Sequence, residues 1–189
     1  MIRILALISV LWIGNVVQAQ DTTAVDSSMA PSFLSSDFEA GPVLNSIQLE
    51  RQKWFTSMDE AMRRPEEVYK LSLSRDKLKA FPYDISRFKN LQVLNLSYNK
   101  IKEVPSEIAE LPNLQTIILT NNKIRSLPDQ MSELNNLEVL YLGNNRLAAM
   151  PSWIGGLSKL RKLDLSYNQL SDYEISLVRY RLPRCEVTH

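Results

Sequence analysis

The stretch LQVLNLSYNKIKEVPSEIAELPN, from Leu91 to Asn113, decides the fold of this 189-residue chain. Its leading leucine, valine and isoleucine positions recur at gaps of three, two, five and three residues. A strand returns to one face every second residue and a helix every 3.6 residues, so neither period alone explains the pattern. The stretch therefore predicts a short strand that is followed by a turn and a return segment.

The same pattern returns every 23 residues in five units, which begin at Val68, Leu91, Leu114, Leu137 and Leu160. Apolar residues occupy positions 1, 4, 6, 11, 14, 18 and 21, and position 6 is always leucine. One unit cannot bury its leucines by itself, whereas stacked copies can. The repeat therefore predicts a solenoid.

Three positions indicate how a unit is built. Positions 4 and 6 share one face of a short strand. Position 15 is proline in four consecutive units, which suits the first turn of a helical or 3₁₀ return segment. Position 9 is asparagine in four units, and its amide can satisfy backbone groups of adjacent turns. Asp76 takes this position in the first unit and can only accept, so we expect a looser first turn.

The pattern LxxLxLxxNxIxxLPxxIxxLxx resembles the leucine-rich repeat, specifically the 23-residue class of bacterial and Ras-suppressor-type proteins. The resemblance covers Val68 to Leu170. It implies an α/β right-handed solenoid with a curved parallel sheet of five to six short strands on the concave side. It also implies protein binding as the usual function.

The terminal units expose half a core, so caps are expected at both ends. Residues 57–67 predict an N-terminal cap helix, in which Ser57 and Glu60 form a capping box and Pro65 ends the helix. Trp54 and Phe55 are expected to cover the same face. The repeats then run over residues 68–170.

Residues 171–189 predict a C-terminal cap helix and a terminal strand. Ser171 and Glu174 would start the helix, with Ile175 and Val178 facing inward. The spacing of Leu182, Cys185 and Val187 copies the strand signature, so we expect Cys185 in a leucine's place as a small buried hydrophobe. The alternative, a redox or catalytic cysteine, lacks a neighbouring histidine, because the sole histidine is the terminal His189.

Residues 1–19 predict a secretory signal peptide, with Arg3, an apolar run from Ile4 to Ile13 and cleavage after Ala19. We therefore expect a secreted, periplasmic or cell-surface protein without membrane insertion after cleavage. Residues 20–56 form an N-terminal extension that we expect to be partly disordered. Within it, residues 43–55 can form a helix, with Val43, Leu44, Ile47 and Trp54 on one side, that docks on the cap or serves as a partner-binding arm.

Charge and motifs exclude several classes of function. A formal net charge of +1 gives no electrostatic argument for a nucleic acid or an anionic membrane. The sequence has no Gly-x-Ser-x-Gly, phosphate loop, HExxH or paired CxxC motif, and one histidine with one cysteine does not favour a metal site. We therefore expect no catalytic residue, no cofactor and no metal, in a protein that is not an enzyme.

Candidate binding residues lie on the concave face, where positions 3 and 5 point away from the leucines and position 8 forms a rim. An apolar centre with a polar surround is typical of protein interfaces, and Lys70, Lys162 and Asp164 would flank this one. The alternative is that β-branched residues simply suit strands. The predicted binding residues are Val93, Asn95, Ile118, Val139, Tyr141, Tyr98, Tyr167, Lys162 and Asp164.

The leading functional hypothesis is an exported, monomeric protein-interaction module whose concave face binds a protein ligand of unknown identity. Two alternatives stay open at this point. One is a structural spacer at the cell surface, and the other is an inhibitor of a secreted enzyme.

Overall fold

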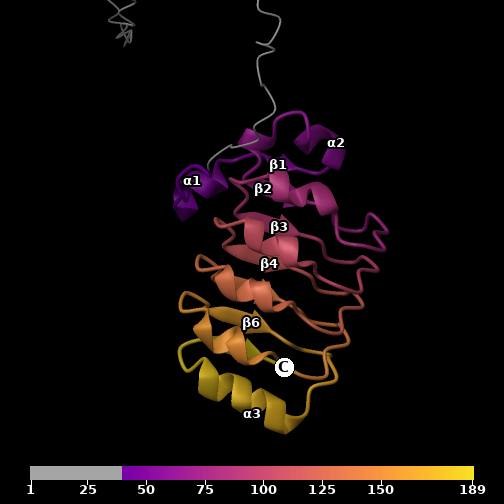
Figure 1. Cartoon of the computed structure of the whole chain (residues 1–189), viewed down its shortest axis with the longest axis vertical. Coiled ribbons are helices and arrows are strands. Elements are labelled where there is room, and N and C mark those ends of the chain that lie inside the picture. Colours follow the sequence, from indigo (N-terminus) through magenta and orange to yellow (C-terminus); the bar gives the residue numbers. More distant parts are fainter. Residues whose placement is uncertain (1–39) are drawn as a thin grey trace, which may run out of the picture. The chain divides into compact units, whose positions relative to one another are not determined.

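The structure is a computed structural model that describes residues 40–189, and these form one parallel sheet with strands in sequence order, β1 to β7 (Figure 1). The predicted signal peptide and residues 20–39 lie outside the described residues. The seven strands are β1 (Trp54–Phe55), β2 (Lys70–Ser72), β3 (Val93–Asn95), β4 (Thr116–Ile118), β5 (Val139–Tyr141), β6 (Lys162–Asp164) and β7 (Glu186–Thr188).

The return segments are 3₁₀ helices on the other side of the core from the sheet. Each of the four in the repeats follows a proline, which serves as the N-cap residue and not as part of the first turn. Extended backbone suits proline there and orients the chain before the turn. These helices are η2 (Tyr83–Arg87), η3 (Ser106–Glu110), η4 (Asp129–Glu133) and η5 (Ser152–Gly156).

The core is a single stack of the repeated apolar positions. Leu94 pairs with Ile117, and Ile117 with Leu140, so equivalent residues lie directly on one another. All three are fully buried. Truncating one such leucine to alanine would cost about 2–5 kcal/mol, because neighbouring rungs cannot close the cavity.

The asparagine column forms the predicted ladder of hydrogen bonds. The Nδ2 of Asn122 donates to the carbonyls of Leu96 and Leu119, both at 3.0 Å. Its Oδ1 accepts from the N–H of Ile101 at 3.1 Å. Asn99, Asn145 and Asn168 repeat this set, so each amide ties its own turn to the preceding one.

The first turn differs from the others, as expected from Asp76. Position 8 has a positive φ in every repeat, but only the first also has one at position 10, where Lys77 has a φ of 60°. Asp76 is exposed, whereas Asn99 and Asn122 are buried.

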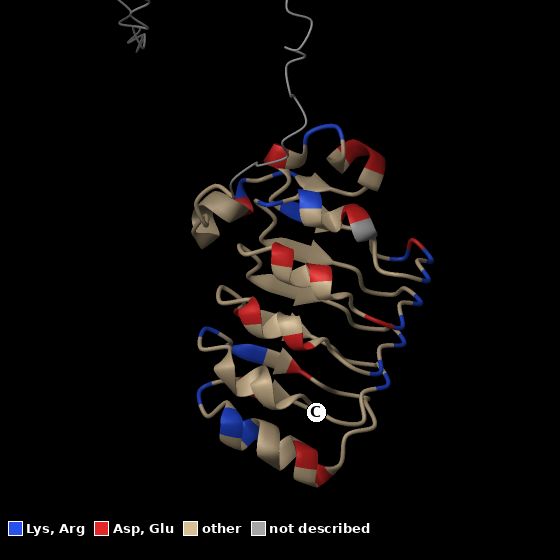
Figure 2. Cartoon of the chain, viewed as in Figure 1, with Lys and Arg blue, Asp and Glu red and all other residues tan. Residues whose placement is uncertain are grey.

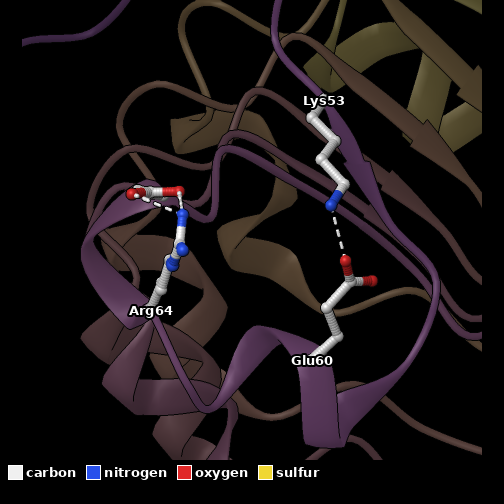
Figure 3. Close-up of polar contacts among 4 residues, drawn as sticks. Lys53, Glu60 and Arg64 are labelled. Atoms are coloured by element: carbon white, nitrogen blue, oxygen red, sulfur yellow. Dashed lines mark hydrogen bonds and ion pairs between the residues drawn. The ribbon is translucent and has the colours of Figure 1, made fainter.

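The N-terminal cap is shorter than predicted. It consists of one turn of helix, α2 (Met58–Ala61), and a 3₁₀ turn, η1 (Pro65–Glu67), so Pro65 begins a turn. The prediction of a capping box is wrong, because the Ser57 side chain makes no cap hydrogen bond. The Glu60 carboxylate instead pairs with Lys53, and Arg64 pairs with Glu67 (Figure 3). An ammonium group attracts the carboxylate more strongly than a neutral backbone N–H does.

Strand β1 was not predicted and raises the strand count above the expected five to six. It pairs Trp54 with Lys70 and Phe55 with Leu71. Successive residues of a strand point to opposite faces. Phe55 is therefore buried in the core as predicted, whereas Trp54 does not cover the core and stands 42% exposed on the concave face.

The C-terminal cap has the predicted helix, α3 (Asp172–Arg181). Ser171 accepts from the N–H of Glu174, and Ile175 and Val178 are buried. Strand β7 pairs Leu163 with Val187, so the prediction for Cys185 is wrong. A turn in which the N–H of Cys185 donates to Leu182 delays the strand, and Val187 occupies the leucine position. No helix in residues 40–189 is both long and apolar enough to cross a bilayer.

Candidate functional site

The concave face carries two rows of side chains that cross the sheet at right angles to its strands. In-register pairing places residues of one row on neighbouring strands, about 4.8 Å apart. The position-3 row reads Trp54, Lys70, Val93, Thr116, Val139, Lys162 and Glu186. The position-5 row reads Ser72, Asn95, Ile118, Tyr141, Asp164 and Thr188.

The centre of this face is apolar and partly exposed. Ile118 pairs directly with Tyr141, and Val139 lies beside Tyr141 in the same three-residue strand β5. Ile118, Val139, Tyr141 and Val93 are all of intermediate exposure. The structure thus brings the four predicted apolar residues together on three adjacent strands.

Charged side chains border the apolar centre on the side of strands β6 and β7. Lys162 pairs with Glu186 at 3.7 Å, and its ammonium lies 5.9 Å from the centroid of the Tyr141 ring. The cation therefore neighbours both a carboxylate and an aromatic face. Lys162 marks the border between the apolar centre and the polar last strand.

Asn95 and Asp164, two of the predicted binding residues, also hold the backbone. The Oδ1 of each accepts from the N–H and the hydroxyl of the serine two residues later, Ser97 and Ser166. This local bonding fixes the chain where it leaves the strand. Both side chains reach the face, but part of their hydrogen-bonding capacity is already used.

The rim tyrosines have an unusual backbone conformation. Tyr98 and Tyr167 have φ values of 56° and 54° and are 50% and 85% exposed. Asn121 and Asn144 occupy the same position in the two repeats between them and bond to each other. Asparagine suits left-handed backbone, whereas a tyrosine there costs about 1 kcal/mol. Residues held in such conformations often serve a function, so the tyrosines are candidates for contact with a partner.

Residues 41–50 bound the other end of the face, and sequence reasoning missed how they are held. Gly41 donates to the Oδ1 of Asn90 at 2.6 Å, and Asn113 donates to the Gly41 carbonyl at 2.9 Å. Leu44 donates to Gln92 and accepts from Gln115. This segment, which we call the arm, therefore lies along the edge where strands β3 and β4 begin.

The arm ends in a short helix, α1 (Ser46–Glu50), which is capped by Asn45 and Gln48. The helix predicted over residues 43–55 is limited to these five residues, and Trp54 lies in a strand. Of its predicted apolar side, Leu44 is partly buried, whereas Val43 and Ile47 are 40% and 64% exposed, so docking of that side on the cap is wrong. Amide side chains hold the backbone instead. The available signal was the recurrence of amides at repeat positions 23 and 2: Asn90 with Gln92, and Asn113 with Gln115.

The arm also changes the role of Lys70. This side chain was expected to flank the concave face, but it is only 6% exposed. Its ammonium donates to the Glu50 carbonyl at 3.2 Å and lies 5.3 Å from the Trp54 ring centroid. A hollow of about 400 Å³ separates α1 from the sheet here, lined by Ser46, Leu49, Glu50, Trp54, Lys70 and Val93.

Cys185 lies outside these rows and is protonated at neutral pH. Burial raises the pKa of its thiol to about 11, and the neighbouring Glu186 carboxylate adds to the shift. A thiolate, the reactive form, is therefore disfavoured. In residues 40–189 no group of three or more His, Cys, Asp or Glu side chains is placed to hold a metal ion.

Comparison with known proteins identifies the family. The leucine-rich repeat region model matches residues 37–179, and the chain belongs to the leucine-rich-repeat family. Proteins of this family commonly mediate protein–protein interaction. No curated protein sequence matches the chain.

Solved structures agree with this fold. A leucine-rich-repeat protein of Leptospira interrogans shares 31% identity at a TM-score of 0.56, over 72% of this chain and 40% of that one. Internalin C2 of Listeria monocytogenes shares 25% identity at a TM-score of 0.59, over 71% of this chain and 56% of that one. The chain therefore spans less than two thirds of either protein.

Proposed function

We propose that the chain is an exported, non-catalytic interaction module that binds a protein partner through the concave face. The observation that carries this proposal is the apolar centre of Ile118, Val139 and Tyr141, which is partly exposed on the concave face, whereas the apolar residues at repeat positions 4 and 6 are buried. Tyrosine beside aliphatic residues in a polar surround resembles the centre of known protein interfaces.

The borders of the face support the same use. Lys162 with Glu186 closes one end, and the arm closes the other. The strained, exposed Tyr98 and Tyr167 add aromatic groups along the rim. Export rests on the apolar N-terminal segment that ends at Ala19, and a monomer is expected because caps cover both ends of the solenoid core.

The test replaces Ile118 by Ser and Tyr141 by Asp, and compares what the variant and the parent capture from a native extract of the source organism. Both side chains are partly exposed and lie outside the leucine core, so the variant should fold. The matched control is Tyr173→Asp with Tyr180→Asp, which alters two exposed tyrosines of α3, away from the face.

We expect the concave variant to lose partner proteins that the control retains, with a loss of at least about 2 kcal/mol in binding for a central tyrosine. Capture of the same proteins at unchanged strength would exclude this face. Circular dichroism on both variants shows that the loss is one of contact and not of folding.

A further inference from the structure

A column of cations follows the edge at which the strands end. Position 10 of the first four repeats is Lys77, Lys100, Lys123 and Arg146, and position 12 of the first three is Lys79, Lys102 and Arg125. Figure 2 shows lysine and arginine on one loop after another along this edge. We call these seven residues the basic ladder.

The backbone places the ladder in register. Position 11 is packed toward the core, so the flanking positions 10 and 12 both point outward. The N–H of Lys100 donates to Leu78 at 2.7 Å, and those of Lys123 and Arg146 donate to Ile101 and Ile124 at 2.8 Å. A second ladder of backbone hydrogen bonds thus fixes successive rungs at about 4.8 Å.

The charge of the ladder is not neutralised locally. The loops 75–81, 98–104, 121–127 and 144–150 hold eight cations and two carboxylates. None of the ladder residues forms an ion pair with a carboxylate in residues 40–189. The 3₁₀ helices η2 to η5 carry five carboxylates and one cation (Figure 2), so the net charge of +1 conceals two surfaces of opposite sign.

The middle of the ladder is hollowed. A depression of about 360 Å³ is lined by four ladder residues together with Glu103 and Ser126. Unpaired cations that face one depression attract an anion, and their alignment over several rungs suits an extended polyanion. Glu103 and Ser126 supply an acceptor and a hydroxyl at the same place, which are partners for the hydroxyl groups of a sugar ring.

Spacing and composition favour a polysaccharide over other polyanions. An extended acidic peptide repeats its same-face side chains roughly every 6.6 Å, longer than the 4.8 Å between rungs. Sites for single-stranded nucleic acid add a series of aromatic stacking platforms, whereas of these four loops only 98–104 exposes an aromatic ring, that of Tyr98. The rung spacing is close to the length of one pyranose unit. We infer that the basic ladder binds a linear polysaccharide that carries carboxylate or sulfate groups on its sugars.

The test measures binding of the purified protein to four probes at equal charge concentration and low salt. The probes are a polygalacturonate fragment, a heparin fragment, poly-L-glutamate and a single-stranded oligodeoxynucleotide. The ladder variant is K102Q with R125Q and R146Q, three exposed residues that line the depression. The control variant is R63Q with K159Q and R184Q, which removes the same charge from exposed sites elsewhere.

We expect one of the two polysaccharides to bind most tightly, with affinity that falls as salt rises. The affinity of the ladder variant should fall about tenfold and depend less steeply on salt, while the affinity of the control variant changes little. A preference between the two probes identifies the acidic group. Absence of polysaccharide binding, equal loss in both variants, or equal binding of polyglutamate or DNA would overturn the inference. The Ile118 and Tyr141 variant should bind polysaccharide normally, which separates this site from the concave face.

Discussion

The two edges of the sheet use the same amide chemistry for different purposes. At the edge where strands end, an asparagine recurs in four repeats and bonds only to its own and the adjacent turn. At the edge where strands begin, Asn90, Gln92, Asn113 and Gln115 bond to the arm, a segment up to 72 residues away in sequence. A repeated amide therefore builds the solenoid, whereas amides at the first two junctions between repeats attach a separate segment.

The largest expected effect is at the strand-end edge. Asn122→Ala leaves the carbonyls of Leu96 and Leu119 and the N–H of Ile101 without their side-chain partner in a buried turn. We expect the free energy of unfolding to fall by about 3 kcal/mol. Urea denaturation measures it, and Asn135→Ala, at an exposed asparagine, should change it by less than about 1 kcal/mol. Equal losses of stability in the two variants would contradict the stabilising role of the asparagine hydrogen bonds.

The strand-start edge should respond locally. Asn113→Ala removes the hydrogen bond to the Gly41 carbonyl and should weaken arm docking by about 1.5 kcal/mol. Hydrogen exchange at the Leu44 and Leu49 amides reports the opening of the arm.

Asn136→Ala is a closely matched control for that measurement. Asn136 occupies the same repeat position one unit later and bonds to Pro112 and Lys159, not to the arm. Its replacement should leave exchange at Leu44 unchanged. Faster exchange there in both variants would show that the arm is held by the solenoid as a whole.

Gly143 tests how closely the strand-end edge is packed. A Cβ at this residue would lie 2.6 Å from the Oδ2 of Asp164 and 2.9 Å from the hydroxyl of Ser166. Gly143→Ala should therefore displace the Asp164 carboxylate from its hydrogen bonds to Ser166. We expect the free energy of unfolding, measured by thermal denaturation, to fall by about 1 kcal/mol. Gly156→Ala is the control, because a Cβ there meets nothing within 4 Å.

The smallest effect has the opposite sign. Tyr167→Asn places asparagine in left-handed backbone, as in the two middle repeats, and should raise the free energy of unfolding by about 0.5–1 kcal/mol. Tyr180→Asn, in the right-handed α3, should give no gain. If Tyr167→Asn is stabilising and also weakens partner binding, the tyrosine is retained for function at the expense of stability.

The sequence predicted the repeats because each repeated residue makes the same contacts with the adjacent repeat. The leucines at positions 4 and 6 pack on equivalent residues, and the asparagine at position 9 bonds to the backbone of its own and the preceding turn, so their environment follows from the period alone. The concave rows follow from strand alternation in the same way, and the structure brings Val93, Ile118, Val139 and Tyr141 together as predicted.

Outside the periodic part, the predictions failed where several partners were available. The Glu60 carboxylate paired with Lys53 and not with a cap N–H, and a turn after Leu182 moved Val187 into the place predicted for Cys185. In the arm, Val43 and Ile47 stay exposed while Leu44 and Leu49 are partly buried, and amide side chains of the solenoid bind the backbone of the arm.

By itself, the sequence determined a stacked leucine-rich-repeat solenoid, its core and the faces of its strands, because these depend on contacts between equivalent positions one period apart. Only the tertiary structure decided where the arm lies and which end of the concave face it bounds. Those features depend on contacts between residues that share no repeat position, such as Gly41 with Asn90 and Lys70 with Glu50.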